Sequence, residues 1–164
     1  MRLIKLAIIS FLIIFLIGWA FSLLIPSHIR ISRAVNIQAQ PDSILALVKD
    51  TQRWPEWHPA FPSSDSSRRL SSLHIDRRTA NDSEVVFDLQ QQGKIPVING
   101  YRLYRYPHVD SVTLQWYMDF NLKWYPWQKF SSLFFENTYG PMMEQGLSRI
   151  KEITQVQPPE TMQY

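Results

Sequence analysis

The residues of this sequence that could carry out acid–base or metal chemistry are its histidines and carboxylates. Side chains that bind one metal ion usually recur at short spacings along the chain. The histidines are far apart, at His28, His58, His74 and His108. We therefore expect solvated or capping roles for them, and we predict no metal site and no catalytic residue.

Other chemical motifs give little support to an enzyme. Asp88 and Asp119 fall on the polar face of predicted strands, where a carboxylate is usually solvated. Arg33 and Asp119 would be the most interesting charges if a cavity were polar. The sequence has no serine in a nucleophile-elbow motif, no glycine-rich phosphate loop and no cysteine. These patterns favour a protein that is not an enzyme without excluding one, and they predict no cofactor.

The charge balance argues against a nucleic-acid partner. The chain has 164 residues, a length typical of one domain, and a net charge of +3. Two of its 17 basic residues, Arg2 and Lys5, precede an apolar N-terminal segment, and all 14 acidic residues follow that segment. The rest of the chain is close to neutral and has no dense lysine or arginine stripe.

The uncharged segment from Leu6 to Ile25 predicts a membrane anchor. As a helix it would span about 30 Å, the thickness of a hydrocarbon core. A cleaved signal peptide is the alternative, but such peptides have shorter apolar runs and a small-residue cleavage site that is missing here. We expect a single-pass protein with a transmembrane anchor at residues 1–26, a globular domain at 27–156 and a disordered tail at 157–164. Basic residues flank the span on both sides, so the positive-inside rule favours an extracytoplasmic domain only slightly.

Hydrophobic periodicity predicts an antiparallel sheet followed by a long helix. Residues 29–39 alternate as a strand, and Pro41 begins a short helix that leads to Trp54 and Trp57. A meander follows, with strands at 70–76, 85–90 and 95–97 and a hairpin turn at Asn99-Gly100. The clearest strand is 112–122, where apolar residues occupy every second position.

The last predicted element is a helix from about Gln128 to Gln155. Its apolar stripe begins at Phe130, Leu133 and Phe134 and continues at spacings of three and four residues. Gly140-Pro141 interrupts this pattern, so we expect a kink or two separate helices there.

Three motifs in this order resemble a known superfamily. Residues 33–41 are similar to an opening strand that ends in Ala-x-Pro, and residues 50–59 resemble an Asp-x-x-x-Trp-x-x-Trp-x-Pro stretch. Gly140-Pro141, Gly146-Leu147 and Lys151 resemble a Gly-Leu-x-x-(Leu/Ile)-Lys close. This combination resembles the SRPBCC, or START-like, superfamily over roughly residues 26–152, and in particular its membrane-anchored polyketide cyclase/dehydrase-like members.

The resemblance implies an α+β helix-grip fold, in which an antiparallel sheet wraps around a long C-terminal helix. It also implies a cavity for an apolar ligand such as a lipid, sterol or polyketide-like molecule. The predicted sheet has five or six strands where the family usually has seven, so the cavity would be shallow or partly filled. Its expected lining is Phe87, Leu89, Leu114, Trp116, Met118, Phe120, Phe134 and Met142, although an apolar stripe more often packs as an ordinary core than lines a pocket.

Two aromatic groups have alternative interpretations. Trp54 and Trp57 could stack on a ligand or could plug the base of the sheet, which their size favours. The segment from Trp124 to Trp127 could enter the headgroup layer, where tryptophan and tyrosine are favoured, or could form a turn packed on the domain.

The sequence supports three functions in decreasing order. The first is a membrane-anchored binding module for a lipid-like or polyketide-like ligand. The second is a non-catalytic interaction or structural protein with a filled core that docks a membrane partner. The third is a cyclase-like or hydrolytic enzyme. The expected partners are the lipid bilayer and an apolar small molecule, and no particular protein partner is indicated.

Overall fold

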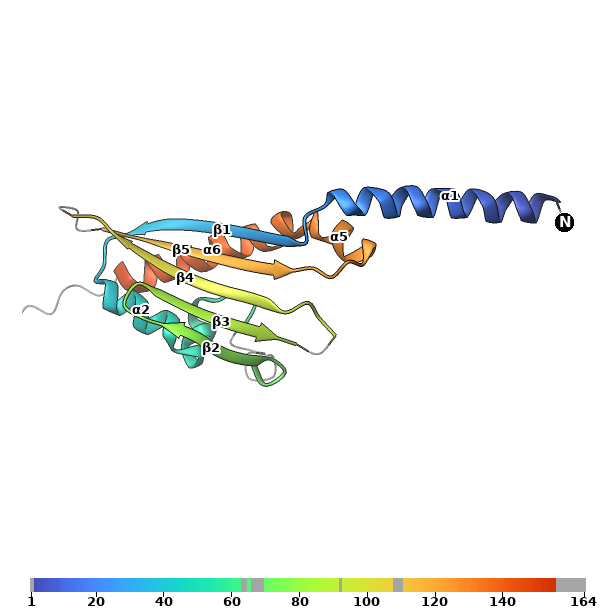
Figure 1. The fold of residues 1–164 in the computed structure, drawn as a ribbon. Coiled ribbons are helices and arrows are strands. Elements are labelled where there is room, and N and C mark those ends of the chain that lie inside the picture. The colour runs from blue at the N-terminus through green and yellow to red at the C-terminus, as the bar shows by residue number, and fades with distance from the viewer. Residues whose placement is uncertain (1, 63–64, 66–69, 92, 108–110, 156–164) are drawn as a thin grey trace, which may run out of the picture.

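A single N-terminal helix projects from one end of a sheet-and-helix domain (Figure 1). The structure is a computed structural model that describes residues 2–62, 65, 70–91, 93–107 and 111–155. The predicted tail at 157–164, the end of the predicted domain at residue 156 and His108 lie outside these residues. Helix α1 (Arg2–Leu24) is long and apolar enough to cross a membrane or to act as a signal sequence.

Five antiparallel strands form the sheet, in the order β1-β5-β4-β3-β2. They are β1 (His28–Ile37), β2 (His74–Ala80), β3 (Glu84–Gln90), β4 (Val97–Arg105) and β5 (Val112–Asn121). The strand predicted at 112–122 is confirmed almost residue for residue, because strict alternation of apolar and polar residues is typical of a sheet with one covered face. The strand predicted at 70–76 is shifted, since β2 begins at His74.

Helices cover one face of this sheet, as the predicted α+β helix-grip fold requires (Figure 1). Helix α2 (Pro41–Lys49) begins at a proline, which suits the first helical turn, and buries Ile44, Leu45, Leu47 and Val48. The short η1 (Thr51–Arg53) and α3 (Trp54–Trp57) follow it. The long α6 (Phe135–Gln155) packs mainly against β1 and also contacts β5.

Two separate helices at Gly140-Pro141, one of the two expected alternatives, are not present, because α6 runs through both residues. The reason for the glycine lies on β1. A Cβ atom at Gly140 would lie 2.7 Å from a terminal nitrogen of Arg33. Arg33 lies over the helix at this point, where it forms ion pairs with Glu136 and Glu144, one turn before and one turn after the glycine. Arg33 therefore joins β1 to α6.

The break in the C-terminal helical region comes earlier. Helix α5 (Pro126–Ser132) ends just before Leu133 and Phe134, and α6 begins at Phe135. Leu133 and Phe134 are exposed, at 61% and 65%, so the prediction that they begin the core-facing stripe is wrong. The helical spacing of apolar residues continues across the break, but the α5 part does not face the domain core.

The predicted hairpin at Asn99-Gly100 is also wrong, since both residues lie in the middle of β4. Asn99 pairs with Met118 of β5, and Gly100 pairs with Tyr117. Glycine is required because the Tyr117 ring lies directly over the strand at this point, so that a Cβ atom at residue 100 would be 2.0 Å from the ring carbon Cζ. An Asn-Gly pair usually marks a turn. Here Asn99 is a buried residue with hydrogen-bond partners inside the domain, and Gly100 leaves room for the Tyr117 ring.

Candidate functional site

The strand register arranges the inner, helix-covered face of the sheet into rows of side chains. The row nearest α1, which we call the α1-end row, comprises Ile29, Phe120, Val97, Leu89 and Ile75. The next rows toward the far end contain Ile31, Met118, Asn99 and Phe87, and then Arg33, Trp116, Tyr101 and Val85. Any ligand held on this face would contact one or more of these rows.

Interlocked aromatic rings fill the middle of the inner face. Trp57 from α3 makes edge contacts with Tyr101 and Trp116, with ring centroids 5.7 Å apart in both pairs. Trp54 makes an edge contact with Phe87 at 5.1 Å. All five side chains are almost completely buried. Trp54 and Trp57 therefore pack as part of the core against the sheet, which was the second of the two interpretations, and not as an open stacking surface.

Helix α6 approaches this block closely. A Cβ atom at Gly146 would lie 2.6 Å from the Trp116 ring and 3.2 Å from Pro59. The small residue of the Gly-Leu close thus lets the helix backbone contact the buried indole. The middle of the grip is occupied by side chains from the sheet, α3 and α6 together.

The buried polar side-chain atoms of the aromatic block have hydrogen-bond partners, with one exception. The buried Asn99 amide donates to the Tyr101 hydroxyl at 2.9 Å and accepts from the Trp116 indole nitrogen. Desolvation raises the pKa of Tyr101 far above its ordinary value, so its hydroxyl stays protonated. Among the described residues, only Trp57 Nε1 is a buried side-chain nitrogen or oxygen without a hydrogen-bond partner. A buried donor of this kind would suit a single acceptor atom of a bound molecule.

His58 is the one buried histidine among the residues that the structure describes. Its imidazole stacks on Trp54 with centroids 5.6 Å apart, and its Nδ1 accepts from the Ala60 backbone N–H at 3.2 Å. Burial lowers the pKa of His58 from 6.5 to about 3. We expected a solvated or capping role for this histidine. The expectation of a solvated ring is wrong, because the imidazole is neutral and buried in the aromatic block.

His58 predicts a pH-dependent stability. The unfolded chain protonates His58 below pH 6.5 and the folded chain only near pH 3, so folding stability falls as the pH falls through this window. Between pH 7 and pH 5 we expect a loss of about 2 kcal/mol from this group. Chemical unfolding of the full chain in detergent micelles should show this slope, and His58→Asn should flatten it. The exposed His74→Asn is the control, and an unchanged slope in His58→Asn would contradict the assignment.

The structure brings most of the predicted lining residues together, with one clear exception. Phe87, Leu114, Trp116, Met118 and Phe120 are buried in the core, and Leu89 and Met142 are half-buried at its border. Phe134 points away from this group and is exposed beside α5. Whether any of them binds a ligand stays a prediction.

The α1-end row is a part of the inner face that stays partly exposed. Its members Ile29, Val97, Leu89 and Ile75 are half-buried, although they face the covered side of the sheet. Only Phe120 is fully buried there, because α6 covers it with Phe135 and Tyr139 at centroid distances of 4.7 and 5.0 Å. The row therefore leaves apolar surface accessible near the start of β1, where the chain leaves α1.

Sequence reasoning missed several residues around the α1-end row. It assigned Leu89 to the lining but not Val97, which faces Leu89 across β3 and β4, because the mistaken hairpin placed a turn next to Val97. Tyr139 and Phe135 were not assigned to the lining because the stripe was placed from Phe130 onward. The four-residue spacing of Phe135, Tyr139 and Met143 could have identified the correct face.

A surface hollow of about 450 Å³ lies at the open edge of the sheet. It is lined by Ser71, Ser72, Leu73, His74 and Gln90. His74 and Gln90 are paired next to the α1-end row members Ile75 and Leu89. This hollow is partly polar and contains none of the predicted lining residues.

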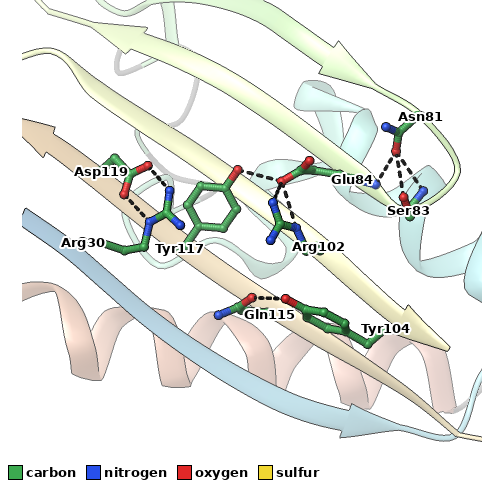
Figure 2. A network of polar contacts seen from close by, with 9 residues as sticks. All are labelled: Arg30, Asn81, Ser83, Glu84, Arg102, Tyr104, Gln115, Tyr117 and Asp119. Atoms are coloured by element: carbon green, nitrogen blue, oxygen red, sulfur yellow. Dashed lines mark hydrogen bonds and ion pairs between the residues drawn. The ribbon is translucent and has the colours of Figure 1, made fainter. Parts of the chain in front are cut away.

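The outer face of the sheet carries a polar network (Figure 2). Arg30 makes two hydrogen bonds of 2.6 Å to Asp119, which is 5% exposed. The expectation that Asp119 is solvated is therefore wrong. On the neighbouring strands, Glu84 accepts from the Tyr117 hydroxyl at 2.9 Å and pairs with Arg102 at 2.7 Å.

Tyr117 is the centre of this network. The Arg30 guanidinium lies 4.6 Å from its ring centroid, and that of Arg102 lies 5.8 Å from it. Desolvation, together with the hydrogen bond to Glu84, raises the pKa of Tyr117 to about 12. The residues of this network come from β1, β5, β4 and β3, so its hydrogen bonds link these four strands. Its two arginines balance its two carboxylates, so the network has no net charge to attract an ionic ligand.

Solved structures share this fold. The di-domain ARO/CYC StfQ from the steffimycin biosynthetic pathway matches with a TM-score of 0.58 and 8% identity, covering 78% of this chain and 51% of that protein. CalU16 from Micromonospora echinospora matches with a TM-score of 0.53 and 13% identity, covering 79% and 68%. A protein from Bacillus thuringiensis matches with a TM-score of 0.54 and 11% identity, covering 77% and 99%. At these identities the likeness shows the fold alone, and this chain spans about half the length of StfQ.

Sequence comparison gives the family. None of the curated proteins matches the chain. Residues 28–155, which run from the start of β1 to the end of α6, match the family described as polyketide cyclase / dehydrase and lipid transport. The chain therefore belongs to this family, as an SRPBCC-type, polyketide cyclase/dehydrase-like member.

Proposed function

We propose that the chain is a membrane-anchored module that binds an apolar ligand, lipid-like or polyketide-like, at the α1-end row. The observation that carries this proposal is the half-burial of Ile29, Val97, Leu89 and Ile75 on the covered face of the sheet. Apolar side chains in such a position gain about 25 cal/mol for each Å² that a ligand removes from water. The family description, with its lipid transport and polyketide chemistry, supports a ligand of this class.

The filled middle of the grip limits how far such a ligand reaches. Trp57, Trp116 and Tyr101 occupy the next positions along the inner face. The ligand would therefore insert one end beneath Tyr139 and Met142 and leave the remainder outside the protein. A shallow site of this kind fits a molecule that stays partly in the membrane.

The anchoring part of the proposal is supported by contacts between α1 and the domain. Lys129 of α5 donates from Nζ to the Ile25 carbonyl at 2.9 Å, directly after the end of α1. Ser22 in the last turns of α1 is fully buried, and α1 contacts α5. Removal of α1 as a signal peptide would break these contacts, so they favour a retained anchor. We keep the slight preference for an extracytoplasmic domain as a prediction.

A second function is favoured by the aromatic block. Rings from β3, β4, β5 and α3 fill the middle of the face that a ligand would otherwise occupy. A chain with such a core would also serve as a non-catalytic interaction or structural protein that docks a membrane partner. The two functions differ in whether the α1-end row takes up a small molecule.

Native mass spectrometry of the full chain, released from detergent micelles, separates these functions. After incubation with a total lipid extract, we expect an equimolar adduct that Val97→Trp removes, because the indole would cover the half-buried side chains of the α1-end row. Tyr104→Trp is the matched control, since Tyr104 lies on the outer face of the same strand. Absence of an adduct, or an adduct that survives Val97→Trp, would reject ligand binding at this row.

A further inference from the structure

Helix α5 buries polar side chains and exposes apolar ones, which is the reverse of a helix on a water-facing surface. Its polar residues Lys129 and Ser132 are buried, at 6% and 5% exposure. The apolar residues on α5 and at its two ends are exposed, and we call this set the aromatic wedge: Trp124, Trp127, Phe130, Leu133 and Phe134. In water, the hydrophobic effect would favour the opposite arrangement, so the wedge indicates an apolar surrounding.

The buried polar side of α5 faces α1. The Lys129 ammonium donates to the Ile25 carbonyl, one of the backbone groups that the end of α1 leaves without a helical partner. A cation is also favoured at this end of a helix by the helix dipole. Since Ser22 is completely buried, α5 packs beside the last turns of α1 and does not merely touch the connection that follows them.

This contact fixes the depth of the wedge relative to a membrane. Helix α1 has 23 residues, a length that matches about 30 Å of hydrocarbon core. Its last turns therefore reach the boundary between acyl chains and headgroups, and α5 lies beside them. Tryptophan is enriched at this level because its ring is apolar while its N–H prefers a polar partner. Stacking of Tyr125 on Trp127, with centroids 4.7 Å apart, holds these rings in one cluster.

We propose that the aromatic wedge inserts into the lipid leaflet in which α1 ends, so that α5 is an interfacial helix. This inference rests on the membrane anchoring of the proposed function. The occupant is the bilayer because α5 contacts α1, whose side chains are apolar and exposed along its length. Two attachments, α1 and the wedge, hold the domain in a fixed orientation, with the α1-end row at the membrane-facing end of the sheet (Figure 1).

The test uses the absence of cysteine from the chain. An environment-sensitive fluorophore is attached to a single cysteine in the full-length protein, reconstituted in phosphatidylcholine vesicles with lipids that carry a quencher near the headgroup or near the chain end. Leu133→Cys reports the wedge, Ile13→Cys reports the middle of α1, and Asp42→Cys reports the far end of the domain. We expect several-fold stronger quenching at Leu133 than at Asp42 with the headgroup-side quencher, and quenching at Ile13 with the chain-end quencher.

The outcomes separate the wedge from the anchor. If Ile13 is quenched and Leu133 behaves as Asp42 does, the wedge is rejected while the anchoring stands. If Ile13 is not quenched, the anchoring fails and the wedge with it. If Leu133 is shielded from aqueous iodide without lipid quenching, a protein or a second copy covers the wedge, which also overturns the proposal.

A second variant checks that the wedge residues themselves cause the insertion. Replacing Trp124 and Trp127 together with serine should reduce lipid quenching at Leu133→Cys toward the level of Asp42→Cys. Both positions are about two-thirds exposed, so the fold should tolerate the change. Tyr106→Ser is the matched control, because Tyr106 is an exposed aromatic residue after β4, at the end of the sheet far from α5. Undiminished quenching in the double variant would contradict the wedge.

Discussion

Gly100→Ala is expected to destabilise the domain by about 3 kcal/mol, the upper part of the range for overpacking a well-packed site. The new methyl group would lie 2.0 Å from Cζ and 2.4 Å from the hydroxyl oxygen of Tyr117. The ring cannot keep its position, so its hydrogen bond to Glu84 and its contacts with both arginines would be lost as well. Chemical unfolding of the full chain in detergent micelles, followed by tryptophan fluorescence, measures this loss.

A double-mutant cycle attributes the effect to the ring. Tyr117→Ala alone should cost stability, but adding Gly100→Ala to it should cost little more, because the space above the strand is then empty. If Gly100→Ala is equally costly with and without Tyr117, the close approach of the ring is not the cause. An unchanged stability in the single variant would contradict the packing of the outer face.

Trp116→Ala is expected to have the largest effect, a loss of about 3–5 kcal/mol, as for other deletions of large buried aromatic side chains. The indole is completely buried and contacts Trp57, His58 and Tyr101. Its removal also leaves the Oδ1 atom of Asn99 without its donor. The same unfolding measurement gives the value, and Trp116→Phe should show an intermediate loss because it removes the donor and keeps most of the ring.

Trp127→Ala is the matched control for this prediction. Both residues are tryptophans, but Trp127 is 66% exposed, so its removal should change the stability of the domain by less than about 0.5 kcal/mol. If Trp116→Ala were equally mild, Trp116 would line a space rather than fill it, and a ligand deeper in the grip would have to be considered. The comparison therefore also tests the extent of the filled middle.

The sequence predicted those elements whose residue pattern has a single local cause. The alternation in β5 reflects one covered face, and the long uncharged run near the N-terminus forms the single helix α1, so both elements were found. The predicted hairpin failed because Asn99 and Gly100 have turn-forming types for tertiary reasons, a buried amide network and a ring lying over the strand. No local pattern distinguishes these causes from a turn.

The same difficulty affected the helices and the site. Gly140 is a potential helix breaker in the sequence, but it makes room for Arg33 from a strand more than 100 residues away. The lining prediction located the inner face of β5 correctly, because period-two alternation is local. It could not show that α3 fills the middle of that face, and it placed Phe134 on the wrong side because α5 faces outward.

The connection between α1 and β1 determines how the domain would respond to mechanical force. Only residues 25–27 separate the helix from the strand, and β1 pairs with β5 along its whole length from His28 to Ile37. Tension applied through α1 would enter along the axis of β1, at right angles to the hydrogen bonds of an antiparallel ladder. All the hydrogen bonds of the ladder would then share the load at once, in shear, and would not open one after another. A pull on α1 would therefore be resisted by the whole β1–β5 ladder.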